Sequence, residues 1–248
     1  MLLAGKSALV TGAANRIGAQ IARTLHQNGA NLIIHYRSSN AAAQTLEQDF
    51  NTLRPGSAVC HQADLCDIGA IETLAQKATQ ALGGLDILIN NASSFYPTRL
   101  GEIGEREWQD LIGSNLKAPL FLSQACYPAL RESSGAIVNM LDIYASSPLK
   151  NHSLYCCAKA ASQMLVKSLA LEMAPEVRVN GIAPGAILWP ESSDASEPKM
   201  QQELLKKIPL QRTGSPDSIA QTVLFLLCQD YITGEVIRVD GGRLLASI

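Results

Sequence analysis

Three side chains that can move protons stand close together in the stretch LDIYASSPLKNHSLYCCAKAA: Asp142, Tyr155 and Lys159. Side chains four residues apart share one face of a helix, so a helix here would place Lys159 beside the hydroxyl of Tyr155. A nearby ammonium favours the phenolate, and an unperturbed tyrosine with a pKa of about 10 is a poor proton donor at neutral pH. The spacing therefore predicts a tyrosine that exchanges protons, with an exposed amphipathic helix face as the alternative.

A turn suited to binding an anion is predicted near the start of the chain. The apolar run KSALV is followed by TGAANRIG and then by the helix-like IARTLHQNGA. Gly12 permits a tight turn, Gly18 lets the helix pack closely on the strand, and the helix N-terminus attracts a pyrophosphate. Arg16 replaces the middle glycine of the GxGxxG pattern, so a plain strand-to-helix turn is the alternative.

The remaining chain alternates strand-like and helix-like segments, which predicts an α/β fold with a parallel, doubly wound sheet. The strand-like runs are NLIIHY, SAVCHQ, LDILIN, GAIVNM, VRVNGI and EVIRVD. Ligands bind such sheets at the carboxyl ends of the strands. We expect Thr11, Asn90, Asp142 and Pro184 at those ends.

Five motifs in order resemble those of the short-chain dehydrogenase/reductase family. They are TGAANRIG, NNAS at 90–93, Asn115, the pair of Tyr155 and Lys159, and APG at 183–185. The resemblance covers essentially the whole chain. It implies a single Rossmann-type domain over 1–248, with about seven strands, helices on both faces and a mobile substrate loop at about 186–208.

Two departures from the family pattern indicate a branch. Arg16 stands where a glycine is usual, and Asp142 stands where the catalytic serine is usual. With NNASSFYPT at 90–98, HYRS at 35–38 and the ending ITGEVIRVDGG, they make the chain similar to the pteridine reductases. The resemblance implies that Asp142, Tyr155 and Lys159 are catalytic. It also implies that Asn115 holds a water linking the lysine to solvent, with a helix-kinking polar residue as the alternative.

The end of the second strand favours NADPH as the cofactor. An acidic residue there would bind the ribose 2′-hydroxyl of NAD, but the chain reads IIHYRSSN and has no carboxylate until Glu47. Arg37 and Ser38, with Arg16 from the glycine turn, can instead surround a 2′-phosphate. The alternative is that Arg37 is a solvated loop charge.

The resemblance places further residues around the cofactor. They are Thr11, Gly12, Ile17, Gly18, His35, Tyr36, Asp64, Leu65, Asn91, Ala92, Ser93, Tyr155, Lys159, Pro184 and Gly185. Asp64 resembles the adenine-contacting aspartate of the family, with a helix N-cap as the alternative. Asn90 and Ala92 are expected close to the cofactor ribose.

The predicted substrate is a pterin or a folate, held against Phe95. A flat heterocycle can stack on this ring, although a loop phenylalanine also serves local packing. The expected substrate-binding residues are Ser93, Phe95, Asp142, Tyr155, Leu188 and Trp189. Trp189 would close over the ligand or simply cover exposed apolar surface.

The charge of Asp142 leaves other functions open. An ionised Asp142 cannot donate a hydrogen bond to a ketone, which favours reduction of a C=N bond. One alternative is a carbonyl reductase, for example of 3-oxoacyl thioesters, with Asp142 protonated. The other is a non-catalytic sensor that binds NADPH.

Composition agrees with small-molecule chemistry. The 248 residues carry a net charge of −2 and are 47% hydrophobic but only 5% aromatic, which suits an aliphatic α/β core and argues against nucleic acid or anionic membrane as partner. The start of the chain reads as a strand rather than a signal peptide, so we expect a cytoplasmic protein. The six cysteines are expected to be reduced, and no metal site is expected. By resemblance, a homotetramer would form through residues 106–130, residues 152–173 and the C-terminal region.

Overall fold

The computed structural model describes residues 2–188 and 198–247, and in this part of the chain the strands form one parallel sheet of seven strands. Their order is β3-β2-β1-β4-β5-β6-β7. The strands are β1 (Ser7–Val10), β2 (Asn31–Tyr36), β3 (Ala58–Gln62), β4 (Ile87–Asn90), β5 (Ala136–Met140), β6 (Arg178–Pro184) and β7 (Val236–Val239). The predicted doubly wound α/β fold is confirmed.

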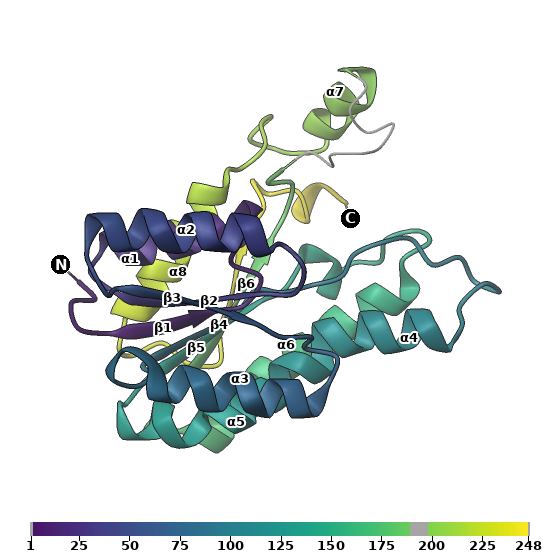
Figure 1. The fold of residues 1–248 in the computed structure, drawn as a ribbon. Coiled ribbons are helices and arrows are strands. Elements are labelled where there is room, and N and C mark those ends of the chain that lie inside the picture. The colour runs from purple at the N-terminus through teal and green to yellow at the C-terminus, as the bar shows by residue number, and fades with distance from the viewer. Residues whose placement is uncertain (1, 189–197, 248) are drawn as a thin grey trace.

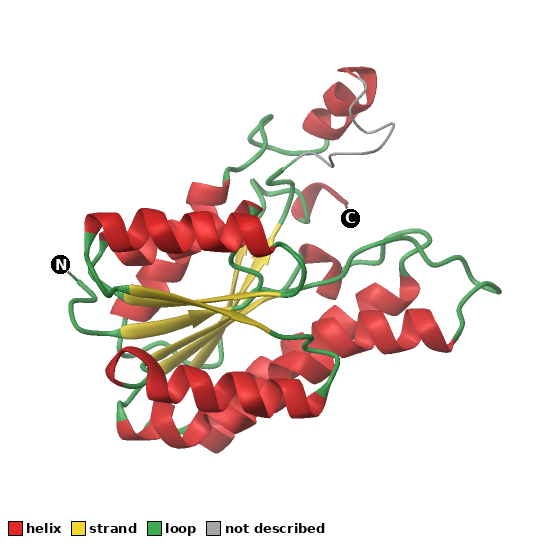
Figure 2. Cartoon of the chain, in the orientation of Figure 1, coloured by secondary structure: helices red, strands yellow, loops and turns green. Residues whose placement is uncertain are grey.

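Helices connect the strands and cover both faces of the sheet (Figures 1 and 2). They are α1 (Arg16–Gln27), α2 (Asn40–Leu53), α3 (Ile68–Gln80), α4 (Glu105–Ile112), α5 (Ala118–Glu132), α6 (Ser153–Met173), α7 (Pro198–Lys206) and α8 (Pro216–Cys228). In Figure 1, α1, α2 and α8 lie on one face, and α3, α5 and α6 lie on the other. Parallel strands joined by right-handed crossovers produce this layering.

The central strands are buried on both sides, which explains why they are apolar without a polar alternate position. In β1, Ala8 and Val10 belong to the apolar cluster beneath α1, α2 and α8, whereas Leu9 belongs to the cluster beneath α3, α5 and α6. All three are 0% exposed. Neighbouring residues of one strand thus anchor two helix layers.

The strand order reverses between β1 and β4, since β2 follows β1 on one side and β4 pairs with it on the other. A crevice forms at such a switch point, beyond the carboxyl ends of the strands. Thr11 follows β1, Asn90 ends β4, and Asp142 follows β5 by two residues. These side chains therefore start from the same edge of the sheet, as predicted.

The predicted loop at 186–208 is only partly described. Residues 198–206 form α7, which lies apart from both helix layers at the top of Figure 1. Residues 189–197, and with them Trp189, lie outside the described residues. The six cysteines are free, as predicted. Among the described helices none is long and apolar enough to cross a membrane.

Candidate active site

The turn after β1 is built around two glycines. Gly12 has a φ of +60°, in the left-handed region that favours glycine. A Cβ atom on Gly18 would lie 2.2 Å from the carbonyl oxygen of Gly12 and 2.6 Å from Nδ2 of Asn91. Only glycine fits there, as the strand-turn-helix pattern predicts. Arg16 also adopts a left-handed backbone, with a φ of +53°, at the position where the family usually has glycine.

His35 ties this turn to the ends of β2 and β3. The N–H of Gly12 donates to Nδ1 of His35 over 3.1 Å, so Nε2 carries the proton and donates to the carbonyl of Ala63 over 3.1 Å. Burial lowers the pKa of His35 to about 4. At neutral pH the imidazole is therefore uncharged and links the Gly12 N–H to the Ala63 carbonyl through two hydrogen bonds.

A pocket of about 380 Å³ opens at the edge formed by these elements. It contains most of the residues predicted to bind a cofactor: Gly12, Arg16, Ile17, Gly18, His35, Tyr36, Arg37, Ser38, Asp64, Leu65, Asn91, Ala92 and Ser93. It also contains residues that were not predicted: Ala14, Asn15, Ser39, Cys66, Ser94 and Ser114. Backbone N–H groups at the start of α1, two arginines and several hydroxyls give it the chemistry of an anion site.

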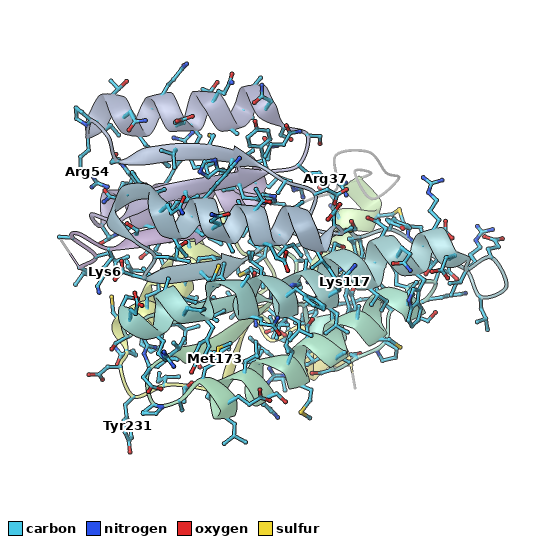
Figure 3. The ribbon with its side chains drawn as sticks, turned by 60° about the horizontal axis from the view of Figure 1, so that its bottom comes forward. Lys6, Arg37, Arg54, Lys117, Met173 and Tyr231 are labelled. Atoms are coloured by element: carbon cyan, nitrogen blue, oxygen red, sulfur yellow. The ribbon has the colours of Figure 1, made fainter. Side chains whose placement is uncertain are left out.

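Arg37 lies at one end of this pocket with 59% of its side chain exposed. Figure 3 shows it at the opposite end of the sheet from Lys6 and Arg54. Its Nη1 lies 3.7 Å from Oδ1 of Asp110 in α4. Such a long, exposed ion pair contributes little stability, so Arg37 can exchange Asp110 for a stronger anionic partner.

Five of the predicted cofactor residues are absent from the pocket lining: Thr11, Tyr155, Lys159, Pro184 and Gly185. Thr11 accepts hydrogen bonds from the backbone of Asn91 and Ala92 and braces β1 against β4. Pro184 ends β6 and Gly185 follows it, whereas Lys159 lies on α6. Tyr155, also predicted, faces the Asp142 end of the crevice instead.

One expectation about this edge needs correction, and an alternative for a second residue is settled. Asn90, expected beside a ribose, is buried and donates to Oδ1 of Asn139 over 2.7 Å. Alternation along the strand directs it inward, and Asn91 lines the pocket in its place. Asp64 lines the pocket, and the N-cap of α3 is not Asp64 but Asp67, whose side chain accepts from the N–H of Ala70.

Asp142 and Tyr155 form a direct pair. The Tyr155 hydroxyl donates to Oδ2 of Asp142 over 2.8 Å. The backbone N–H of Tyr144 donates to Oδ1 over 2.9 Å, at the start of the short helix Ile143–Ala145. Each carboxylate oxygen therefore has one donor, and the carboxylate orients the phenol.

Burial and neighbouring charges act on the pKa values of both groups in this pair. Burial, and then the charge of Asp142, raise the pKa of Tyr155. Burial also raises the pKa of Asp142, against the opposing effects of its hydrogen bonds and nearby cations. Burial and Asp142 thus act against the expected effect of Lys159, which is to favour the phenolate of Tyr155. The carboxylate contacts the hydroxyl directly, whereas Nζ of Lys159 lies 5.7 Å from the centroid of the ring.

Lys159 is buried on the face of α6 that meets the end of β5. Its Nζ donates to the carbonyl of Met140 over 2.9 Å. Burial lowers the pKa of Lys159 to about 8, with Asp142 acting in the opposite direction. The site thus places the Lys159 side chain and the Asp142 carboxylate close to one phenol.

Asn115 lies in a π-helical turn, Gly113–Lys117, between α4 and α5. Its Oδ1 accepts from Ser93 over 2.7 Å, and its Nδ2 donates to the carbonyl of Ser94 over 2.9 Å. Ser162 of α6 donates to its main-chain carbonyl. Such turns free a carbonyl from the helix and often occur at functional sites. Asn115 therefore holds the loop after β4 against α6.

Phe95 lies in that loop and is 53% exposed. Its ring stacks on His152, with centroids 4.8 Å apart and an angle of 17°, and meets the Tyr155 ring edge-on at 4.8 Å and 75°. The N–H of Thr98 donates to the carbonyl of Asn151 over 2.6 Å. The loop is thereby fastened to the start of α6 beside the phenol. Leu188 is 37% exposed at the last residue described before the gap.

Four residues that hold the side chains around Phe95 and Asp142 in place were not predicted from the sequence. Asp110 accepts a hydrogen bond from Ser94 and faces Arg37, and His152 covers Phe95. Tyr144 and Arg243 bond to each other through the tyrosine hydroxyl. None of the four lies in a recognisable motif. Arg243, however, directly follows the ending ITGEVIRVDGG, which resembles that of the pteridine reductases.

Comparisons with known proteins agree with this geometry. The family described as Enoyl-(Acyl carrier protein) reductase matches residues 12–243. Pteridine reductase 1 of Leishmania tarentolae is 39% identical over 95% of each chain. A 3-oxoacyl-[acyl-carrier-protein] reductase of Staphylococcus aureus is 35% identical over 96% of this chain and 97% of its own. An uncharacterized oxidoreductase of Methylorubrum extorquens is 34% identical over 97% and 98%. The chain therefore belongs to the short-chain dehydrogenase/reductase family, and it is an oxidoreductase.

Proposed function

We propose that the protein is an NADPH-dependent pteridine reductase, which reduces a C=N bond of a pterin, a dihydropterin or dihydrofolate. The observation that carries the proposal is the hydrogen bond from Tyr155 to the Asp142 carboxylate. An ionised carboxylate accepts hydrogen bonds from the N–H groups of a pterin but cannot donate one to a ketone oxygen. The 39% identity to a protein named Pteridine reductase 1 supports this substrate class.

The pocket residues fit a dinucleotide that carries a 2′-phosphate. Gly18 leaves the cradle at the start of α1 without a Cβ atom, and the N–H groups there suit a pyrophosphate. Arg37, Ser38 and Ser39 line the end of the pocket, and no carboxylate follows β2 before Glu47. A charge-assisted contact from Arg37 would favour NADPH over NADH. When bound, NADPH supplies the hydride for the reduction.

The heterocycle would lie on Phe95, on the ring face that His152 does not cover. Stacking with an offset suits two flat π-systems. The bonds of Ser93 and Ser94 to Asn115 hold the loop in place before a ligand arrives. The binding surface is therefore preorganised, which lowers the entropic cost of binding.

Tyr155 donates the proton in this mechanism. Hydride addition to a C=N bond leaves an electron pair on nitrogen that is much more basic than a phenolate, so even a phenol with a raised pKa is an adequate donor. The positive charge of Lys159 stabilises the Tyr155 phenolate that remains after proton transfer. Asp142 holds the hydroxyl and accepts N–H groups of the substrate.

A carbonyl reductase is the second candidate. Burial raises the pKa of Asp142, and a protonated carboxyl can donate to a ketone oxygen. The 35% identity to a 3-oxoacyl-[acyl-carrier-protein] reductase favours the same alternative. Both candidates use the same phenol and the same lysine.

One assay separates the two functions. NADPH oxidation is followed with biopterin, dihydrobiopterin, dihydrofolate, monapterin and an acetoacetyl thioester as substrates. We expect turnover of at least one pterin or folate to exceed that of the thioester. Faster thioester turnover would establish the carbonyl reductase, and binding of NADPH without turnover of any substrate would indicate a sensor.

We also propose a homotetramer. Large apolar side chains are exposed along α4, α5 and α6: Trp108 (50%), Leu120 (36%), Met164 (61%) and Leu171 (83%). Exposed apolar surface of this kind is suited to contact with a second subunit. Sedimentation equilibrium measures the mass, and a monomer of 26.5 kDa would contradict the proposal.

A further inference from the structure

We propose that Arg243, in the segment after β7, is a positioning residue that holds the Asp142 carboxylate in the orientation that Tyr155 requires. The role of Arg243 in catalysis rests on the proposed function, whereas the electrostatic coupling between Arg243 and Asp142 does not.

A chain of contacts leads from Arg243 to the phenol. Nη2 of Arg243 donates to the Tyr144 hydroxyl over 2.7 Å, and the guanidinium carbon lies 5.6 Å from the centroid of the Tyr144 ring. The backbone N–H of the same tyrosine donates to Oδ1 of Asp142 over 2.9 Å. Tyr155 occupies Oδ2 of that carboxylate. Arg243 therefore anchors the residue that fixes one carboxylate oxygen.

The charges around Asp142 give Arg243 an electrostatic role as well. Three elements present titratable or charged groups to the carboxylate: Tyr155, Cys156 and Lys159 from α6, Tyr144 from the short helix after β5, and Arg243 from the C-terminal segment. Two of these groups, Lys159 and Arg243, are cations that lower the pKa of Asp142 against the effect of burial. Lys159 comes from α6, whereas Arg243 comes from the C-terminal segment, about a hundred residues after Asp142 in the sequence.

The turn that carries Arg243 is itself well defined. Asp240 accepts from the N–H groups of Gly242 and Leu244, each over 2.9 Å. Gly241 and Gly242 have φ values of +64° and +83°, and a Cβ atom on Gly241 would lie 2.8 Å from Cγ2 of Ile208. The segment after α7 therefore packs against the turn that presents Arg243 to Tyr144. Such fixed geometry is what a positioning residue needs.

A thermal double-mutant cycle tests the coupling without measuring activity. At pH 7.5, Arg243→Met should lower Tm by about 1 to 3 °C more in the wild-type background than in the Asp142→Asn background, because the attraction needs a charged carboxylate. The matched control is Arg238→Met, an exposed arginine of β7, which should have the same effect in both backgrounds. Equal effects of Arg243→Met in both backgrounds would overturn the proposal.

Kinetics test the catalytic part. In the pH profile of kcat/KM for dihydrobiopterin, the ionisation of Asp142 is the one that Asp142→Asn removes. Arg243→Met should move it to higher pH by about 0.5 to 1 unit, and Arg243→Lys should reverse most of this shift because it keeps the charge. An unmoved ionisation would contradict the role of Arg243 in catalysis. Absence of pterin turnover in the wild type would instead refute the proposed function, and the thermal cycle would still decide the coupling.

Discussion

The two ends of the crevice are built in different ways. The pocket proposed for the cofactor is formed mostly by residues at or just after the ends of β1, β2, β3 and β4, and neutral groups such as His35 and the Gly12 N–H hold it together. The Asp142 end combines side chains from distant segments around buried charges. The pocket can thus be made largely from strand ends, whereas the proposed proton-transfer site needs charges brought together from across the fold.

The largest effect is expected from the phenol. Tyr155→Phe should lower kcat for pterin reduction by about 10² to 10⁴, because the proton donor is lost, and should leave NADPH affinity nearly unchanged. Stopped-flow rates and fluorescence titration of NADPH measure the two quantities. Tyr231→Phe, at a fully exposed tyrosine, is the control. A Tyr155→Phe variant with wild-type turnover would show that another group supplies the proton.

Protonation of His35 at acid pH should lower the free energy of unfolding. Its folded pKa of about 4 lies below the ordinary 6.5, so its contribution is fully present above pH 6.5 and is lost as the pH falls toward 4. The linked loss of unfolding free energy is about 3 kcal/mol. Denaturant unfolding from pH 7.5 to 4.5 should show a shallower pH dependence in His35→Gln than in the wild type.

The control for this experiment is His61→Gln, at a partly exposed histidine on β3. It should keep most of the wild-type pH dependence. If the free energy of unfolding of His35→Gln and of the wild type depended equally on pH, the link between Gly12 and Ala63 would not require a neutral imidazole.

Arg37→Ala should weaken NADPH binding by about tenfold or more, because it removes a charge-assisted contact with the 2′-phosphate, and should change NADH binding little. Isothermal titration gives both dissociation constants. Arg23→Ala, at an exposed arginine paired with Asp49, should change neither. Equal affinities of the wild type for the two cofactors would refute the assignment of NADPH.

A smaller effect is expected at the substrate surface. Phe95→Ala should lower kcat/KM for dihydrobiopterin by about fivefold, which corresponds to a stacking contact of about 1 kcal/mol, with NADPH affinity intact. Leu100→Ala, at a 91% exposed residue farther along the same loop, serves as control. Global unfolding of Phe95→Ala would assign the ring to packing instead.

The sequence allowed correct prediction of the fold, and most of the residues that it predicts for the cofactor line the pocket, because both follow from local patterns. Apolar runs mark buried strands, and polar residues directly after them must lie at one edge of the sheet. The inward direction of Asn90 depends on its alternation within β4, which the motif alone does not reveal.

The protonation of the phenol could not be predicted in the same way. The spacing of Tyr155 and Lys159 indicates proximity, but the direct bond from Tyr155 to Asp142 and the burial of the pair decide the direction of the pKa shift. Arg243 is distant in sequence from both. Long-range contacts of this kind appear only once the chain is folded.

The most direct test of pteridine reduction compares two substrates in two proteins. We measure kcat/KM for dihydrobiopterin and for an acetoacetyl thioester with the wild type and with Asp142→Ser. We predict that the wild type prefers the pterin and that Asp142→Ser loses most pterin turnover while NADPH affinity stays nearly unchanged, because serine removes the charge that holds Tyr155 and the heterocycle. A wild-type preference for the thioester, or full pterin turnover in Asp142→Ser, would contradict the assignment.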